Sequence, residues 1–408
     1  METIYLDNAA TTPVDPRVAE EMLACMGPAA DFANASSVSH GPGRRASARI
    51  EAARSAVAAL AGAAPEQIVW TSGATEANNL AIFGAARFHR SKGAHIVTSR
   101  TEHPSVLDPC RRLEREGFEV SYLRPGPDGI VEPPQVEAAL RADTILVSLM
   151  HVNNETGVIQ DVGEVGRVCR ARGVLLHVDA AQSAGKLGLD VVRDRIDLLA
   201  LTAHKLNGPK GVGALCVRRE PRLGLVPLLY GGGQERGLRS GTLPTHQIAG
   251  FGAACRIAAA EMTEEAARVT HLRNRLWSAL STLPGILLNG SEHRRAPGIL
   301  NVSIPGVEGE SLLLALSDLA VSSGSACATL RGEPSYVLRA LGRSEQLAQG
   351  SLRISLGRYT TADDVERAAM RIRAEVGRLR RADARRPALR GRGAAPLPRA
   401  ARCRGGFG

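Results

Sequence analysis

Between about residue 66 and residue 220, short apolar runs alternate with segments of helical periodicity. The runs are Ile68–Thr71, His95–Thr98, Thr144–Met150, Val174–Val178, Asp197–Leu201 and Gly213–Val217. Near-continuous apolar strands separated by helices predict an α/β fold, with a mostly parallel central sheet covered by helices on both faces. Ligands of such sheets bind at the carboxyl ends of the strands, so the chemistry of this chain is expected there.

After Thr242 the pattern changes and predicts a smaller α+β domain. A long helical stretch over about residues 245–282 precedes strands near 299–304, 319–322 and 352–356, and a last helix is expected from about 361 to 380. The expected division is an N-terminal arm at 1–15 that belongs to the small domain, a large domain at 16–255, the small domain at 256–380 and a tail at 381–408.

The charge is concentrated at the C-terminal end. Of the net charge of +10, residues 378–408 carry +9, with ten Arg and one Asp, which leaves the rest of the chain nearly neutral. We expect the Arg-rich segment 381–408 to be a disordered, solvated extension, with weak contact to anionic partners as the alternative. No direct binding of nucleic acid is expected beyond that contact.

Several classes of protein are excluded. No apolar run approaches the roughly 18 residues of a membrane-spanning helix, and residues 1–7 are acidic where a secretory signal needs basic residues. We therefore expect a cytoplasmic protein with no membrane contact. No phosphate loop of the Walker type and no Gly-x-Gly-x-x-Gly follows a suitable strand, which argues against nucleotide triphosphatases and Rossmann dehydrogenases.

Lysine is scarce, with only Lys92, Lys186, Lys205 and Lys210 beside 47 Arg. Arginine stays protonated and does not serve as a Schiff-base amine, so a lysine just after a strand is informative. Seven cysteines are widely spaced and lack a Cys-x-x-Cys pair, which argues against a disulfide framework or a zinc site made by the protein alone.

Three strand ends carry residues that suit one cofactor. The strand 68–71 leads into the small-residue turn 72–78 before a helix, which suits a phosphate, although a plain capped turn is the alternative. Asp179 ends a strand and suits a protonated ring nitrogen or a helix cap, and Lys205 follows the next strand. Imine, ring nitrogen and phosphate are the three contacts that pyridoxal 5'-phosphate requires.

Four further residues have settings that suggest chemistry. His103 follows a strand and suits stacking on a flat ring, with a structural histidine as the alternative, and Asn154 suits a ring hydroxyl or an Asx turn. Cys327 lies in the small, polar segment 322–335, which we expect to be a mobile loop that lets a thiol travel to a bound substrate; a fortuitous exposed cysteine is the alternative. Arg353, a charge within a strand-like run, suits a carboxylate.

Taken in order, these motifs resemble the cysteine desulfurases over about residues 3–380. The motifs are Asp7–Pro13, Thr71–Asn78, Thr101–His103, His151–Glu155, His177–Gln182, His204–Lys205, Arg239–Thr242 and Ser322–Cys327. The long segment 322–335 looks like the extended cysteine loop of the branch that serves iron–sulphur cluster assembly.

The resemblance implies a fold-type-I pyridoxal phosphate enzyme, homodimeric, that converts L-cysteine to L-alanine with a persulfide on Cys327. The large domain at 16–255 would bind the cofactor. Lys205 would form the imine, Asp179 would pair with the ring nitrogen, and His103 would stack on the ring and assist proton transfer. The remaining cofactor contacts would come from Ala74, Thr75, Asn154, Gln182, Thr202, His204 and, from the other subunit, Thr242.

Substrate and partners follow from the same resemblance. Arg353, together with Asn34, would bind the substrate carboxylate. The sulphur would pass to an iron–sulphur scaffold protein and other acceptors, with tRNA thiolation as a further destination, and Cys327 would share a transient cluster with the scaffold. Asn34-Ala35 and Gly231–Gln234 depart from the family's usual Asn-Pro and Gly-Gly-Gly-His. The alternative is another pyridoxal-dependent lyase or aminotransferase, including selenocysteine lyase.

Overall fold

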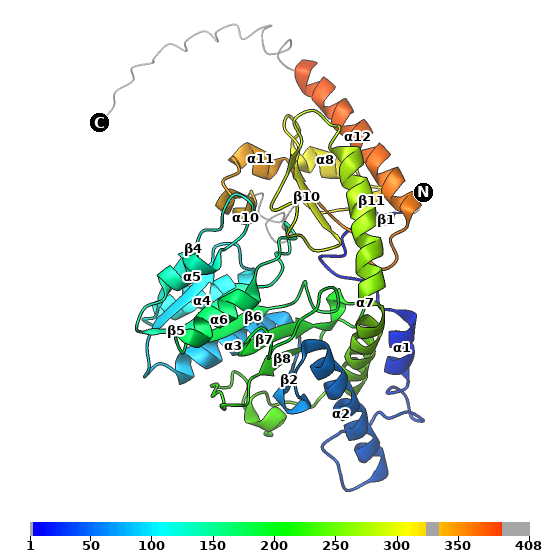
Figure 1. Ribbon diagram of the computed structural model, residues 1–408. Coiled ribbons are helices and arrows are strands. Elements are labelled where there is room, and N and C mark those ends of the chain that lie inside the picture. The colour runs from blue at the N-terminus through cyan, green and yellow to red at the C-terminus, as the bar shows by residue number, and fades with distance from the viewer. Residues whose placement is uncertain (1–2, 324–333, 386–408) are drawn as a thin grey trace, which may run out of the picture.

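The structure is a computed structural model that describes residues 3–323 and 334–385. A seven-stranded sheet forms the larger part of the molecule (Figure 1). Its strands are β2 (Ile68–Thr71), β3 (His95–Ser99), β4 (Glu119–Leu123), β5 (Thr144–Met150), β6 (Leu175–Asp179), β7 (Leu198–Thr202) and β8 (Gly213–Val217). They lie in the order β2-β8-β7-β6-β5-β3-β4, and only β8 runs antiparallel to its neighbours β2 and β7.

This arrangement confirms the predicted mostly parallel sheet. The predicted strands are all present, although the strand expected at 174–178 spans Leu175–Asp179, so Asp179 is its last residue. The edge strand β4 was not predicted. Its residues are exposed or only partly buried, so its sequence lacks the continuous apolar character of the central strands.

Helices cover both faces of the sheet because every central strand is apolar on both sides. Ile68 and Trp70 pack into one core, while the intervening Val69 packs into the other. The first core is completed by α2 (Gly41–Ala61), α6 (Val162–Ala171) and the first half of α7 (Thr245–Leu280), and the second by α3 (Ala74–Phe88) and α4 (Pro104–Arg115). Two further helices, α1 (Pro16–Leu23) and α5 (Pro133–Ala139), pack against α7 and α6.

A third core belongs to the smaller part of the molecule. Its sheet has the order β12-β10-β9, and a separate parallel pair joins the N-terminus to a later strand. The strands are β9 (Leu287–Leu288), β10 (Ile299–Ser303) and β12 (Ser351–Ser355), with β1 (Ile4–Tyr5) paired to β11 (Leu319–Ala320). The helices are α8 (Gly309–Ala315), α10 (Tyr336–Ala340), α11 (Glu345–Gln349) and α12 (Ala362–Arg385).

The long helix α7 connects the two parts and runs beside α12 in the upper half of Figure 1. It passes position 255 without a break, and the expected domain boundaries remain predictions. Helix α12 continues beyond the expected end at Arg380, so residues 381–385 are helical rather than part of the tail. The strong helix formers Arg and Ala in this stretch explain the extension.

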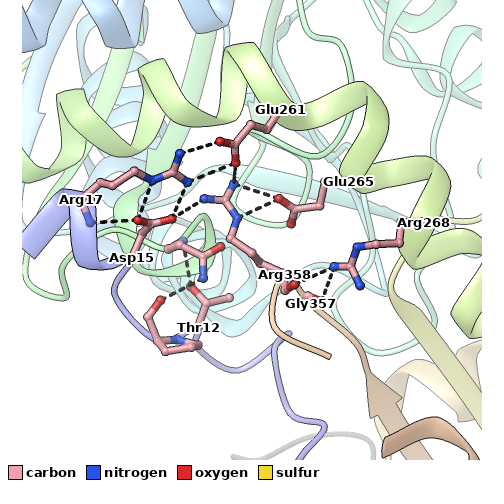
Figure 2. A network of polar contacts seen from close by, with 10 residues as sticks. Thr12, Asp15, Arg17, Glu261, Glu265, Arg268, Gly357 and Arg358 are labelled. Atoms are coloured by element: carbon pink, nitrogen blue, oxygen red, sulfur yellow. Dashed lines mark hydrogen bonds and ion pairs between the residues drawn. The ribbon is translucent and has the colours of Figure 1, made fainter. Parts of the chain in front are cut away.

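A polar network joins the N-terminal segment, α7 and the segment after β12 (Figure 2). The carboxylate of Asp15 lies 2.8 Å from Arg17 and 2.7 Å from Arg358, whose guanidinium also lies 2.8 Å from Glu265. Hydrogen bonds from Arg17 and Arg358 hold the pKa of Asp15 well below its ordinary value. Because Asp15 is buried, these guanidinium groups compensate a charge that would otherwise be costly.

Candidate active site

A cavity of about 470 Å³ opens at the carboxyl ends of β2, β5, β6 and β7. The predicted cofactor residues that line it are Ala74, Thr75, His103, Asn154, Asp179, Gln182, Thr202, His204 and Lys205. They come from separate strand ends because parallel strands bring their carboxyl ends to one edge of the sheet. The structure therefore brings together predicted residues that are spread over more than a hundred positions of the sequence.

Asp179 ends β6 and is buried beside the cavity. Its Oδ2 accepts a hydrogen bond of 2.8 Å from Asn78 Nδ2, and its Oδ1 accepts one of 2.9 Å from the backbone N–H of Ala181. These bonds fix the orientation of the carboxylate. The group is thus suited to hold a cationic N–H donor in the cavity.

Lys205 closes the 3-10 turn Ala203–Lys205 that follows β7. Burial lowers the pKa of its amine, and Asp179 opposes that shift while Arg353 adds to it. A lowered pKa increases the fraction of free amine at neutral pH, which is the form that attacks a carbonyl carbon. Lys205 and Asp179 therefore face one cavity as a nucleophilic amine and an anion.

His103 begins α4 as its N-cap, with its ring partly buried in the same cavity. Its Nδ1 accepts from the backbone N–H of Ser105 at 3.1 Å and lies 2.8 Å from Ser105 Oγ. Asn78 Nδ2 in turn donates to Ser105 Oγ at 2.8 Å. With Ser105 donating to Nδ1, the neutral ring carries its proton on Nε2. Burial lowers the pKa of this histidine, which keeps the ring neutral at neutral pH.

Asn78 and Ser105 were missed in the sequence analysis. Through them a continuous chain of hydrogen bonds runs from Asp179 to His103. Asn78 lies at the end of the motif 71–78, but no local pattern shows that its side chain turns toward a strand 101 residues further along.

The turn between β2 and α3 forms the end of the cavity that suits a phosphate. Gly73 has φ +152°, and its turn packs so closely that a Cβ on Gly213 would lie 2.6 Å from Gly73 Cα. Neither position accommodates a side chain, which keeps the backbone of the turn open to a ligand. Helix α3 begins at Ala74, so its first N–H groups and the positive end of its dipole face this space.

An acidic side chain also reaches this turn. Glu76 accepts a hydrogen bond of 2.7 Å from the backbone N–H of Ser72, and its charge is balanced by Arg239 at 2.8 Å. Despite the burial that opposes it, hydrogen bonds from Arg239 and Ser72 lower the pKa of Glu76, so the group stays ionised. The positive end of the α3 dipole and the guanidinium of Arg239 thus offset the negative charge of Glu76, which lies near the turn that suits a phosphate.

Three buried oxygens of the cavity have no hydrogen-bond partner among the described residues. They are Thr202 Oγ1, Asn154 Oδ1 and Gln182 Oε1. Gln182 is oriented by donation from its Nε2 to the carbonyl of Ala9 at 2.7 Å. Since unpaired buried polar atoms cost free energy, this clustering indicates a polar ligand with several hydrogen-bonding groups.

The residues predicted to bind the substrate carboxylate, or to serve the site of a second subunit, have settings that differ from those of the cofactor residues. Arg353, on β12, is only 3% exposed, and it donates to Asp7 Oδ1 at 2.7 Å and to the carbonyl of Asn154 at 2.9 Å. Its Nε has no partner among the described residues. Asn34 and Thr242 are exposed and do not line the cavity of their own chain.

The cysteines divide into two groups. Cys25, Cys110, Cys169, Cys216 and Cys255 are buried, and burial raises the pKa of Cys110, Cys169 and Cys216 to about 12. These thiols therefore stay protonated and unreactive. Cys327, the predicted nucleophile and cluster ligand, lies outside the described residues, and no cluster of three or more metal-ligating side chains occurs within 3–323 and 334–385.

Comparison with known proteins decides the family. The family model described as aminotransferase class-V matches residues 4–368. The chain is 56% identical over 377 residues to the cysteine desulfurase IscS of Enterobacter sp. (strain 638) and 58% identical to that of Tolumonas auensis, each alignment covering 92% of this chain and 93% of the relative. The chain belongs to the class-V aminotransferase family, among the cysteine desulfurases.

Solved structures of this family have the same fold. A NifS-like protein superposes with a TM-score of 0.85 at 36% identity, covering 92% of this chain and 99% of its own. A structure described as SspA in complex with cysteine superposes with a TM-score of 0.77 at 39% identity, covering 88% of this chain and all of the other. The predicted fold-type-I architecture is thereby confirmed.

Cysteine desulfurases of this family are pyridoxal phosphate enzymes, and the cavity of this chain fits that group. The open turn before α3 suits the phosphate, the carboxylate of Asp179 suits the pyridinium nitrogen, and the amine of Lys205 suits the aldehyde carbon. The three unpartnered oxygens match a cofactor whose rim carries hydroxyl and phosphate groups.

Among the described helices, none is long and apolar enough to cross a membrane.

Proposed function

We propose that this protein is a cysteine desulfurase that transfers the sulphur of L-cysteine to Cys327 and releases L-alanine. In this reaction the Cβ–S bond of the substrate breaks and an S–S bond forms on the enzyme. The substrate carbon is reduced to a methyl group and gains a proton, while the sulphur atoms are oxidised to a persulfide. The observation that carries the proposal is the convergence of Lys205 and Asp179 on a cavity with three unpartnered buried oxygens.

Pyridoxal phosphate, when bound, supplies an electrophilic carbon and a ring that accepts an electron pair. Asp179 would pair with the ring nitrogen and favour its protonated form. Lys205 would hold the cofactor through its amine, and as a free amine it would move the proton of the substrate Cα. Contacts from Ala74, Thr75, Asn154, Gln182, Thr202 and His204 would fix the phosphate and the ring substituents.

His103 is proposed to stack on the ring and to move a proton at the substrate sulphur. Its Nδ1 is occupied by Ser105, so Nε2 is the nitrogen available for that transfer. Arg353 is proposed to bind the substrate carboxylate through its guanidinium. Because that group contacts Asp7 in this structure, substrate binding requires the carboxylate to share or replace the contact with Asp7.

A homodimer is part of the proposal. Thr242 and Asn34 are exposed and lie away from the cavity of their own chain, which fits residues that serve the site of a second subunit. Large apolar side chains are also exposed on the same two stretches of sequence, and they are Leu23, Met26, Phe32, Val38, Leu229 and Tyr230. Burial of these side chains between two copies would remove an exposed apolar surface from water.

The sulphur acceptors are proposed from the family alone. We infer that the persulfide passes to an iron–sulphur scaffold protein and to other acceptor proteins in the cytoplasm. The substrate L-cysteine has additional support, because one structural neighbour was solved in complex with cysteine.

Two substitutions test the proposed chemistry. Lys205→Ala is expected to lose the visible absorption band of the bound cofactor and at least about 10³-fold of the alanine production from L-cysteine. Cys327→Ala is expected to keep that band and to lose sulphide release in the presence of a reductant. Full activity of Cys327→Ala would instead indicate another pyridoxal-dependent lyase, such as one acting on selenocysteine.

A further inference from the structure

Both ends of the segment that contains Cys327 are bonded to elements of the active site. At the preceding end, Ser322 forms a backbone pair with Arg353, with N–O distances of 3.1 Å and 2.7 Å. At the following end, Ser335 Oγ donates to Glu155 Oε2, and Tyr336 OH donates to the carbonyl of Glu102 at 2.7 Å. Arg353 is itself a proposed site residue. Glu155 directly follows Asn154, and Glu102 directly precedes His103.

Glu155 is fully buried, and it is the member of this set that accepts its bond through a carboxylate oxygen. Its backbone is held by Asn153 Oδ1, which accepts from Glu155 N at 3.0 Å, and by Asn301 Nδ2, which donates to Glu155 O at 3.1 Å. The second carboxyl oxygen, Oε1, has no partner among the described residues. A rigid backbone with one side-chain bond to Ser335 therefore defines where that serine lies.

Burial of this carboxyl group is costly, and the surroundings offset the cost only in part. Burial raises the pKa of Glu155 to about 7, while the hydrogen bond from Ser335 and the charge of Arg353 oppose the rise. A hydrophobic residue at this position would avoid the cost, so stability alone gives no reason for an acid here. The bond to Ser335 is what the acid provides.

Ser335 links this bond to the start of α10. Its Oγ accepts from the backbone N–H of Leu338 at 3.1 Å, so the same hydroxyl caps the helix and donates to Glu155. The orientation of the chain as it leaves the cysteine-bearing segment is thereby fixed relative to Asn154, the neighbour of Glu155.

We propose that Glu155 and Ser335 are positioning residues for sulphur transfer, which fix the following end of the cysteine-bearing segment relative to the substrate site. This inference rests on the proposed role of Cys327 as the sulphur acceptor. Neither residue touches the reacting atoms. Their removal should slow the arrival of the thiol at the substrate sulphur and leave substrate binding unchanged.

The experiment compares two steps of a single turnover on the holoenzyme. Rapid mixing with L-cysteine gives the absorbance change of the bound cofactor, which reports substrate binding. Quenching and mass spectrometry of the peptide with Cys327 then give the rate of persulfide formation. For Ser335→Ala and Glu155→Leu we expect persulfide formation to slow about tenfold or more, with the absorbance change at its wild-type rate.

Two controls separate positioning from a general loss of structure. Ser344 caps the neighbouring helix α11 through the same kind of bond to Leu347 N at 3.3 Å, so Ser344→Ala should leave both rates unchanged. Glu155→Gln keeps an acceptor oxygen for Ser335 and should restore persulfide formation to within about twofold of the wild type.

The outcomes distinguish this inference from the proposed function. Absence of a persulfide on Cys327 in the wild type would overturn the function itself. A wild-type persulfide rate in Ser335→Ala, equal slowing in Ser344→Ala, or equal slowing of the absorbance change would each overturn the positioning role while leaving the desulfurase assignment intact.

Discussion

The two ends of the active site are built in different ways. The cofactor end comes from consecutive strand–helix junctions, and it leaves the buried oxygens of Thr202, Asn154 and Gln182 unpaired. At the proposed substrate end, the two terminal guanidinium nitrogens of Arg353 already contact Asp7 and the carbonyl of Asn154, and its Nε alone is left unpaired among the described residues. The first end thus offers unpaired polar atoms to a ligand that stays bound, whereas the proposed substrate contact at the second end must share or replace one that Arg353 already makes.

This difference predicts how each end responds to mutation. Loss of a group at the cofactor end removes a contact that nothing else in the chain replaces. Loss of a group at the substrate end also releases a partner such as Asp7, so binding and stability change together. Three experiments sharpen or break this contrast.

Asp179→Asn should give the largest effect. The amide can still accept from Ala181 N, so we expect the fold to be retained, but the charge proposed to keep the ring nitrogen protonated is lost. We expect activity to fall about 10²- to 10³-fold, measured as alanine formed at saturating cysteine. Asp197→Asn is the matched control, since this buried acid lies at the opposite end of the sheet, bonded to Leu176 N. Equal losses in both variants would contradict the role of Asp179.

The cofactor end should also make the protein sensitive to acid through His177. This residue lies two positions before Asp179 on β6 and is fully buried, and burial lowers its pKa to about 4. Above pH about 6.5 the ring is neutral in both folded and unfolded chains, and as the pH falls toward 4 only the unfolded chain takes up the proton. The folded state should lose roughly 3 kcal/mol over that range.

Urea unfolding at pH 7 and pH 4.5 measures this loss. His177→Gln, which keeps a polar group beside Ser148 Oγ, should show a smaller decrease in stability between the two pH values than the wild type. An identical decrease in both proteins would show that other groups cause the acid sensitivity.

Arg353→Lys should give the smallest of the three effects. Lysine keeps the positive charge but loses the paired N–H donors that match a carboxylate, so KM for L-cysteine should rise about tenfold with a smaller change in kcat. Arg343→Lys, in which a partly buried guanidinium bonded to Asn289 Oδ1 is changed in the same way, should leave KM unaltered. A lower kcat at unchanged KM would place Arg353 outside substrate binding.

The cofactor end could be predicted because its signals are local in sequence. A strand followed by Asp179, or by the turn that holds Lys205, is visible within a few residues. The scarcity of lysine singled out Lys205 further. The same reasoning found the central strands and missed β4, whose side chains are not buried like those of the centre of the sheet.

At the substrate end a local pattern, a charge within a strand-like run, singled out Arg353 itself, but its contacts could not be predicted because they join distant residues. Arg353 meets Asp7 across 346 positions, and Glu155 meets Ser335 across 180. No local sequence pattern near Arg353 or Glu155 indicates which distant residue it contacts. Only the family resemblance assigned Thr242 and Asn34, because their proposed roles depend on a second subunit.

The central claim is that the sulphur of L-cysteine leaves the cavity on Cys327. Its most direct test is a single turnover of the holoenzyme with one equivalent of L-cysteine, followed by mass spectrometry of the Cys327 peptide and quantification of alanine. We expect alanine and Cys327 peptide that carries one added sulphur atom to form in equal amounts. Stoichiometric alanine with an unmodified Cys327 would contradict the account.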